Sequence, residues 1–548
     1  MLRGRLRTKA VCRPFVRLIA VRLMAPTLAS LLLLVTGKTI LSAEEFRTPL
    51  ISAVHVEWRA VLDQFRSEIN TRPSVAPTFT FAAQRRVPAS DPRSTPALVQ
   101  LNAVTSQIFP GIGRSPVPVL LPFDTAAFLD ERSHGVPESL SPARYQADFR
   151  SVDFFDAGQA GYDAVFSLEP GVGDGLPQRI FVKPVEIQIT GSILIYDISD
   201  PLGDKGEPVK ALAAQFPDLR RFIREGYVRY AFTRFGVPYV VSIQCLDSAP
   251  RERRLACREA YPVAERFLKA LHIAGGQPSR ARSDIQSDIA ERPAEAAADF
   301  IYHPTGDIIT NSGFRRQGGR PDFTAYSQIR FPVDRIPAFV RSQSFGKRDK
   351  ADLPSGGYPW RDNFCESRSF AVGQCPSGFG HQGEDIRPAP CPANNDNGAH
   401  CDPRQQPVVA VRDGVLIRSL KQQAATLQIN TANEHIRFRY MHMNPSSMDN
   451  DGVLSGRRVA EGERIGVVSN YLDHPNGTTR HLHFDVQVFT RDGWLWVNPY
   501  VTLISAYERS IRGHGHEIGP EIAASAVAHA LPEDVIHPDP HEGSESEP

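Results

Sequence analysis

His481-Leu482-His483-Phe484-Asp485-Val486 is the stretch that decides how the C-terminal part of this 548-residue chain folds. Apolar residues alternate with His and Asp, which is the period of a β-strand that buries one face. We expect Leu482, Phe484 and Val486 to face a core, so that both histidines project together from the opposite face. Two neighbouring imidazoles are candidate metal ligands, although a solvated or hydrogen-bonded pair is the more common outcome of this pattern alone.

Short alternating runs bounded by Gly, Asp and Asn surround this stretch. They predict strands at 408–411, 415–420, 426–429, 436–442, 465–468 and 481–488. Strands this short, with turn residues between them, are typical of an antiparallel β domain.

A second motif is Gly380-His381-Gln382-Gly383-Glu384-Asp385. A neutral imidazole and a carboxylate four residues apart can reach one cation, because Gly383 allows a tight turn between them. An ordinary loop is the alternative.

The third motif, Arg439-Tyr440-Met441-His442-Met443, ends a predicted strand. Alternation puts His442 on the same face as Phe438 and Tyr440, and therefore at the edge of the core. A core histidine bonded to the backbone is the alternative for this residue taken singly.

In this order, the three motifs resemble the lysostaphin-type zinc endopeptidases, the LytM-like murein hydrolase family. The resemblance covers about residues 376–503. It is supported by Pro407-Val408-Val409-Ala410, Asp413-Gly414-Val415, Gly462-Glu463-Arg464-Ile465-Gly466 and Val497-Asn498-Pro499. The family likeness implies a mainly antiparallel β peptidase domain.

Carried over residue by residue, the resemblance implies one zinc ion held by His381, Asp385 and His483, with His442 and His481 as the catalytic pair. Three protein ligands leave a fourth position for water, as in catalytic zinc sites. The family's substrate would then be peptide cross-links of bacterial peptidoglycan, hydrolysed by zinc-activated water. The motifs of other hydrolases, such as H-E-x-x-H and G-x-S-x-G, are absent from the sequence.

The chain departs from the family pattern at two places. It inserts a polar loop between Cys391 and Cys401, and residues 469–480 replace the usual Gly- and Ser/Thr-rich approach to the last histidine pair. All five site positions nevertheless hold competent residue types. A catalytically silent LytM-like module that binds the cell wall or activates another hydrolase is the main alternative, and a secreted peptidase that cleaves proteins is a third.

The cysteines predict a disulfide set, as is typical of exported proteins. Six of the seven cysteines follow the N-terminal segment, as the sequence-local pairs Cys245 and Cys257, Cys365 and Cys375, and Cys391 and Cys401. We favour nearest-neighbour disulfides, although six cysteines allow 15 connectivities. None of the spacings fits a structural zinc site.

The N-terminus predicts a signal peptide over residues 1–43. Seven basic residues precede an apolar run from 23 to 35, which is shorter than the roughly 20 residues of a membrane-spanning helix. An uncleaved anchor is the alternative, and membrane contact is expected only in that case. We expect the protein in the periplasm or outside the cell. A net charge of +1 gives no basis for nucleic-acid binding.

The remaining patterns predict a multidomain α+β chain. An N-terminal helix and Pro-rich irregular segment (44–150) precede a small mixed α/β domain without assigned chemistry (151–275), a linker (276–350), the LytM-like domain (351–505) and a disordered His-rich acidic tail (506–548). Within 151–275 we expect one hairpin across Thr190-Gly191 and another around Gly236. Upstream segments that cover the substrate groove would make the enzyme latent, and truncation to about residue 350 would then raise activity.

Overall fold

The computed structural model describes 50–70, 96–133, 141–168, 185–198, 206–224, 227–245, 256–278, 300–306, 328–334, 338–340, 359–366, 368, 370, 375, 379–388, 406–419, 423–472 and 474–517. The expected signal peptide, the 391–401 loop and most of the tail lie outside these residues. Two compact units divide the chain, Met1–Glu45 and Phe46–Pro548, and all described residues belong to the second. Among them, no helix has the length and apolarity needed to span a bilayer.

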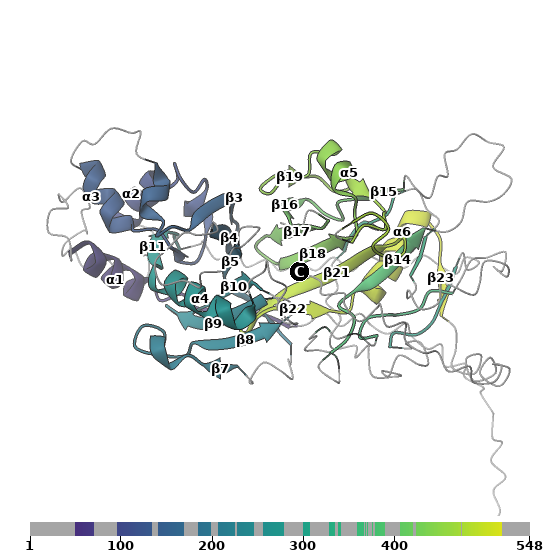
Figure 1. Ribbon diagram of the computed structural model, residues 1–548, viewed down its shortest axis with the longest axis horizontal. Helices are drawn as coiled ribbons and strands as arrows, with labels where there is room; N and C mark the ends of the chain where they lie inside the picture. The colour runs from purple at the N-terminus through teal and green to yellow at the C-terminus, as the bar shows by residue number, and fades with distance from the viewer. Residues whose placement is uncertain are drawn as a thin grey trace, which may run out of the picture. The chain divides into compact units, whose positions relative to one another are not determined.

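The upstream part of this unit contains a seven-stranded antiparallel sheet (Figure 1). Its order is β3 (Arg150–Ala157), β4 (Gly161–Leu168), β5 (Val185–Ser192), β10 (Val237–Gln244), β9 (Tyr227–Arg234), β8 (Arg220–Arg224) and β7 (Glu207–Pro208). The hairpin expected around Gly236 is confirmed: β9 pairs with β10 in register. Phe235 and Gly236 have φ values of 55° and 76°, and such a pair of left-handed residues suits a two-residue hairpin turn.

The hairpin expected across Thr190-Gly191 is wrong. Both residues lie inside β5, which pairs with β4 and β10, while β6 (Leu194–Asp197) pairs with β1 (Leu50–Ala53). A Cβ at Gly191 would lie 2.6 Å from the ring of Tyr239. The glycine therefore permits close packing within the sheet and does not mark a turn.

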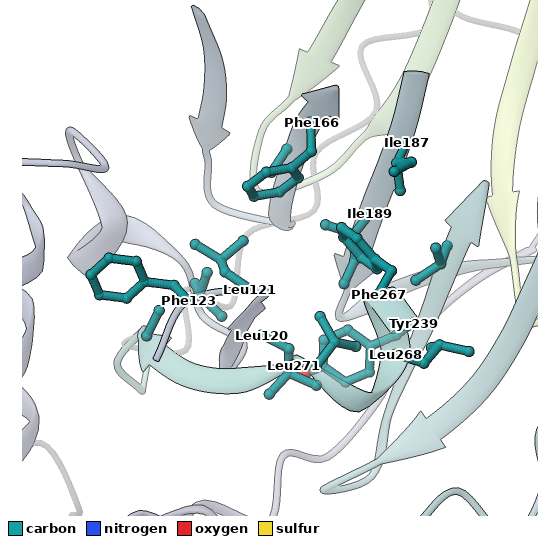
Figure 2. Close-up of a cluster of buried hydrophobic side chains, with 14 of the residues drawn as sticks. Leu120, Leu121, Phe123, Phe166, Ile187, Ile189, Tyr239, Phe267, Leu268 and Leu271 are labelled. Carbon is teal, nitrogen blue, oxygen red and sulfur yellow. The ribbon is translucent and has the colours of Figure 1, made fainter. Parts of the chain in front are cut away.

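Helix α4 (Ala260–Lys269) packs against β9 and β10 of this sheet, and residues of the other helices share its core. These other helices are α1 (Trp58–Asn70), α2 (Pro96–Thr105) and α3 (Thr125–Ser133), with short 3-10 helices at Ile112–Arg114, Pro142–Tyr145, Lys210–Leu212 and Cys257–Glu259. Strand β2 (Val119–Leu121) pairs with β11 (His272–Gly275). Figure 2 shows Leu120 and Phe123 packing with Phe166, Ile189 and Phe267 in one apolar cluster. Residues on both sides of the expected boundary at 150 therefore share one core.

The downstream part is built on an eight-stranded sheet, as the alternating patterns predict (Figure 1). Its order is β13 (Ala338–Val340), β14 (Glu384–Pro388), β21 (Leu482–Thr490), β18 (His435–Met441), β17 (Ala425–Asn430), β16 (Gly414–Arg418) and β19 (Arg458–Val459), with β22 (Gly493–Val497) beside β21. Strand β15 (Pro407–Val409) pairs with β20 (Arg464–Val467), and the helices are α5 (Pro445–Asn450) and α6 (Tyr500–Ile511).

One face of this sheet forms the downstream core. Leu482, Phe484 and Val486 are buried there with Phe438 and Tyr440. The expected alternation along β21 is therefore confirmed, and His483 and Asp485 lie on the other face.

Described residues from the expected linker belong to this downstream part. Strand β12 (Phe300–Tyr302) pairs with β23 (Gly515–Glu517), and β13 pairs with β14. Phe331 and Val340 are buried in the downstream core. The chain between 276 and 350 thus supplies strands and core residues. Order also continues past residue 505, because α6 and β23 occupy positions assigned to the tail.

Candidate metal centre

Strand pairing brings two of the proposed ligands together. Asp385 on β14 lies directly opposite His483 on β21 in an antiparallel register. Opposed residues of such a pair project from the same face with their Cβ atoms about 5 Å apart. A carboxylate and an imidazole from positions 98 residues apart in the chain therefore face the same point.

The loop before β14 places His381 beside them. A Cβ at Gly383 would lie 2.3 Å from the carbonyl oxygen of Phe484, so only glycine lets this loop pass so close to β21. The backbone of Cys365 donates a hydrogen bond to the carbonyl of His381. A disulfide joins Cys365 to Cys375 next to this contact. The loop is thus fixed from both sides.

Three potential ligand atoms converge at this place. Nε2 of His381 lies 3.0 Å from Nδ1 of His483, and Oδ1 of Asp385 lies 3.4 Å from each of these nitrogens. Zinc bonds of about 2.0–2.1 Å in tetrahedral geometry place neighbouring ligands about 3.3 Å apart. The three residues are at most 5% exposed, and they form a group that is able to hold a metal ion.

Hydrogen bonds on the outer side of the rings determine which nitrogens face the centre. Nδ1 of His381 contacts the carbonyl oxygen of Asn363 at 3.1 Å, and Nδ1 of His481 contacts that of Thr479 at 2.8 Å. A ring nitrogen beside a carbonyl carries the proton, so each Nε2 presents a lone pair to the carboxylate. Within the described part of the chain, both Asp385 oxygens and Nε2 of His481 are buried without a hydrogen bond. A cation would satisfy this electron-rich cluster.

The charge state of the cluster suits a metal. Burial opposes ionisation of Asp385, but the imidazoles of His481 and His381 hold the pKa of its carboxyl well below its ordinary value. Burial also lowers the pKa of His481 well below its ordinary value, with a further contribution from His442 and partial opposition from Asp385. At neutral pH the centre therefore contains a carboxylate and a neutral His481.

His442 reaches the centre by a route that the alternation does not predict. Strand β18 ends at Met441, and His442 has a φ of 64°, in the left-handed region. This backbone turns the side chain away from the core face that carries Tyr440. Its ring centroid lies 4.6 Å from that of His481 and 6.2 Å from that of His483. The expected burial of His442 is confirmed, since it is 3% exposed, but its expected position on the face of Tyr440 is wrong.

The structure thus assembles all five residues singled out from the sequence. The groups around them are not predictable from the motifs: the carbonyls of Asn363, Thr479 and Tyr471, the last of which lies 3.2 Å from Nδ1 of His442. Backbone carbonyls leave no trace in residue type, so no pattern could have indicated them. Arg439 was also missed, although its position opposite Asp485 follows from the strand register.

Two of the favoured disulfides are present, Cys245–Cys257 and Cys365–Cys375. Cys391 and Cys401 lie outside the described residues. The Cys365–Cys375 bridge lies next to the His381 loop, and the Cys245–Cys257 bridge belongs to the upstream core.

Comparisons with known proteins find similarity only to solved structures. No family model matches the sequence, and no curated protein matches it either. Among solved structures, a LytM protein from Ruminococcus gnavus named for glycyl-glycine endopeptidase activity is similar over 38% of this chain and 69% of its own, at 17% identity and a TM-score of 0.21. The antimicrobial peptidase lysostaphin from Staphylococcus simulans is similar over 33% of this chain and 58% of its own, at 19% identity and a TM-score of 0.16. With scores this low, neither similarity decides the fold or the activity.

Proposed function

We propose that this protein is an exported zinc metalloendopeptidase that hydrolyses peptide cross-links of bacterial peptidoglycan. The observation that carries the proposal is the convergence of His381, Asp385 and His483 into one buried group with zinc-compatible spacing, with two further histidines beside it. Two nitrogens and one carboxylate oxygen leave a fourth position, which distinguishes a catalytic zinc site from a closed structural one. When bound, zinc would polarise the scissile carbonyl and acidify a water molecule.

His481 is the group placed to accept a proton. Its Nδ1 is held by the Thr479 carbonyl, and its Nε2 lies 3.3 Å from Oδ1 of Asp385. An unprotonated nitrogen at that position lies within reach of a nucleophilic water beside the ligand group. The lowered pKa of His481 keeps it in the accepting form at neutral pH.

His442 is placed to handle the leaving amine. It lies farther from His483 than from His481, and the Tyr471 carbonyl fixes its ring through Nδ1. With Nδ1 protonated beside that carbonyl, Nε2 carries a lone pair. It can take up a proton that the attacking water releases and pass it to the amine when the peptide bond breaks. Amide hydrolysis needs one proton transfer from the attacking water and one to the leaving amine. The differently oriented rings of His481 and His442 can serve these two transfers.

The histidines of the centre are buried. His381, His442 and His481 are 5%, 3% and 0% exposed. A peptide cross-link needs an open groove, so a neighbouring segment has to move before substrate enters. The segment that bears Tyr471 and Thr479 contacts both proposed catalytic histidines through its backbone carbonyls, so its movement would change the orientation of both rings.

The test is digestion of isolated peptidoglycan by the zinc-loaded protein, followed by mass spectrometry of the fragments. We expect new peptide ends with the wild type and none with Asp385→Ala or after chelation. The bond that is cut follows from the fragment masses. Intact peptidoglycan in all three reactions would contradict the peptidase activity and favour the catalytically silent module. Cleavage of a protein substrate but not of peptidoglycan would contradict only the proposed substrate class.

A further inference from the structure

His483 is held differently from the other histidines of the centre. It presents Nδ1 to the ligand group, whereas His381 presents Nε2. The backbone around His483 pairs with β14 on one side and with β18 on the other. The Nε2 of His483, which points away from the ligand group, therefore contacts a side chain, whereas the corresponding nitrogens of His381 and His481 contact backbone carbonyls. That side chain is Asp485, two residues along the same face, whose Oδ2 lies 3.4 Å from Nε2 of His483.

Asp485 is itself held by an arginine on the neighbouring strand. Arg439 lies directly opposite Asp485 in the β18–β21 register, and its Nε donates to Oδ2 at 2.6 Å. Asp485 is fully buried, so this charge-assisted bond provides the compensation that a buried carboxylate requires.

The same arginine reaches the loop that carries the first ligand. Nη2 of Arg439 donates to Oε1 of Gln382 at 3.0 Å, next to His381 in the chain. The guanidinium also lies 5.8 Å from the ring centroid of Trp496. The guanidinium group of Arg439 thus links the strand that bears His483 to the loop that bears His381.

We propose that Asp485 and Arg439 are positioning residues of the metal centre, which hold the His483 ring so that its Nδ1 lone pair faces the metal. The inference rests on the proposed function and extends it to residues outside the ligand set. A carboxylate that accepts from the outer N–H of a ligating imidazole fixes the tautomer and raises the basicity of the ligand nitrogen. The 3.4 Å contact is longer than a good hydrogen bond, and we expect it to shorten when the ring binds metal.

The test is the zinc affinity of full-length variants, measured by competition with a chromophoric chelator. Asp485→Asn keeps the shape but removes the charge, and we expect binding to weaken about 10- to 100-fold. Asp485→Glu restores a carboxylate and should recover most of the affinity. Thr426→Val is the matched control, because Thr426 lies opposite Arg439 on β17 and should leave the affinity within about twofold.

A second readout separates positioning from a purely structural role. With cobalt in place of zinc, the visible absorption spectrum reports the ligand field, and we expect Asp485→Asn and Arg439→Lys to change it. Thermal unfolding of each variant measures the folded fraction, so affinities refer to folded protein. If Asp485→Asn fails to fold, Arg439→Lys replaces it in the test. The expected result is then a cobalt spectrum of Arg439→Lys that differs from that of Thr426→Val.

The outcomes distinguish this inference from the proposed function. A wild type that binds zinc and cleaves peptidoglycan, with unchanged affinity and spectrum in every Asp485 and Arg439 variant, overturns the inference alone. A different outcome is a wild type that cleaves nothing but binds zinc, with affinity that falls in Asp485→Asn. This result would contradict the proposed peptidase activity and support the positioning role of Asp485. A wild type that binds no zinc overturns both.

Discussion

His442 occupies a backbone conformation that few residues adopt. A φ in the left-handed region is unusual outside glycine, although His tolerates it better than branched residues do. Such strain persists where the surrounding structure fixes it, and it is concentrated at functional sites. Here it turns the ring from the core face toward His481, which gives the proposed catalytic pair its geometry.

Replacing His442 with Ala should separate catalysis from metal binding. We expect peptide cleavage to fall about 10²- to 10⁴-fold because a proton-transfer group is lost. Zinc content and circular dichroism should stay unchanged, since His442 is outside the ligand group. His474→Ala is the control, as His474 is an exposed histidine of the same region. Cleavage by His442→Ala at the rate of His474→Ala would contradict a catalytic role for His442.

The pH dependence of the zinc-free protein should report on His481. Its pKa is lowered in the folded state, while the unfolded chain has the ordinary value of about 6.5. The unfolded chain therefore binds the proton more readily, so stability is fully present above about pH 6.5 and declines as the pH falls toward the folded-state pKa. We expect the thermal midpoint to drop between pH 6.5 and 5, and His481→Gln to reduce that slope. An identical slope in the variant would show that His481 does not titrate in this way.

At the scale of single elements, the sequence predicts some features and misses others for definite reasons. The strands of the downstream sheet could be predicted because one buried face imposes strict alternation, as along β21. The interruption at Gly191 was misinterpreted, because a glycine that makes room for the Tyr239 ring looks the same in sequence as a turn glycine. Strands β12 and β13 could not be predicted, because polar and proline residues dominate 276–348 and three residues each are too few to show a period.

The disulfide beside the metal centre should matter more for zinc than its counterpart upstream. The bridges Cys365–Cys375 and Cys245–Cys257 close loops of similar length, with sequence separations of 10 and 12. Removing either by paired Cys→Ser substitution should cost about 2–4 kcal/mol of unfolding free energy. Only loss of Cys365–Cys375 should also weaken zinc binding, because Cys365 contacts the His381 backbone. Equal zinc affinity in the two double variants, by chelator competition, would contradict this difference.

At the scale of the whole molecule, the upstream sheet and the downstream sheet are joined by a buried polar network. Asp163 on β4 contacts Nε2 of His435 at 2.7 Å and Nη2 of Arg437 at 2.9 Å, both on β18. Burial opposes its ionisation, but His435 and Arg437 hold the pKa of Asp163 below its ordinary value. Apolar contacts flank the network, such as Val240 with Trp494. Along β18, His435, Arg437 and Arg439 share the polar face that continues to the metal centre.

This network changes the expectation for truncation. Removing everything before residue 350 would leave Arg437 without its carboxylate and would delete β12 and β13 from the downstream part. A truncated chain that loses activity would therefore not argue against latency. Opening of the centre is better tested in the full chain, by variants that loosen the segment bearing Tyr471.

Asp163→Ala should lower the unfolding free energy by about 3–5 kcal/mol, because it leaves Arg437 buried and unpaired. Urea unfolding of the full chain measures this loss. Asp63→Ala is the control, since its ion pair with Arg66 is exposed and should be worth less than about 1 kcal/mol. Similar midpoints for the two variants would contradict a structural role for the Asp163 network.

The central claim is that His381, Asp385 and His483 hold one zinc ion. Equilibrium dialysis of the full chain against buffered zinc, followed by elemental analysis, tests it most directly. The account predicts one zinc per chain for the wild type and for His442→Ala, and loss of tight binding in Asp385→Ala. A wild type without stoichiometric zinc, or an Asp385→Ala variant that retains it in full, would contradict the claim.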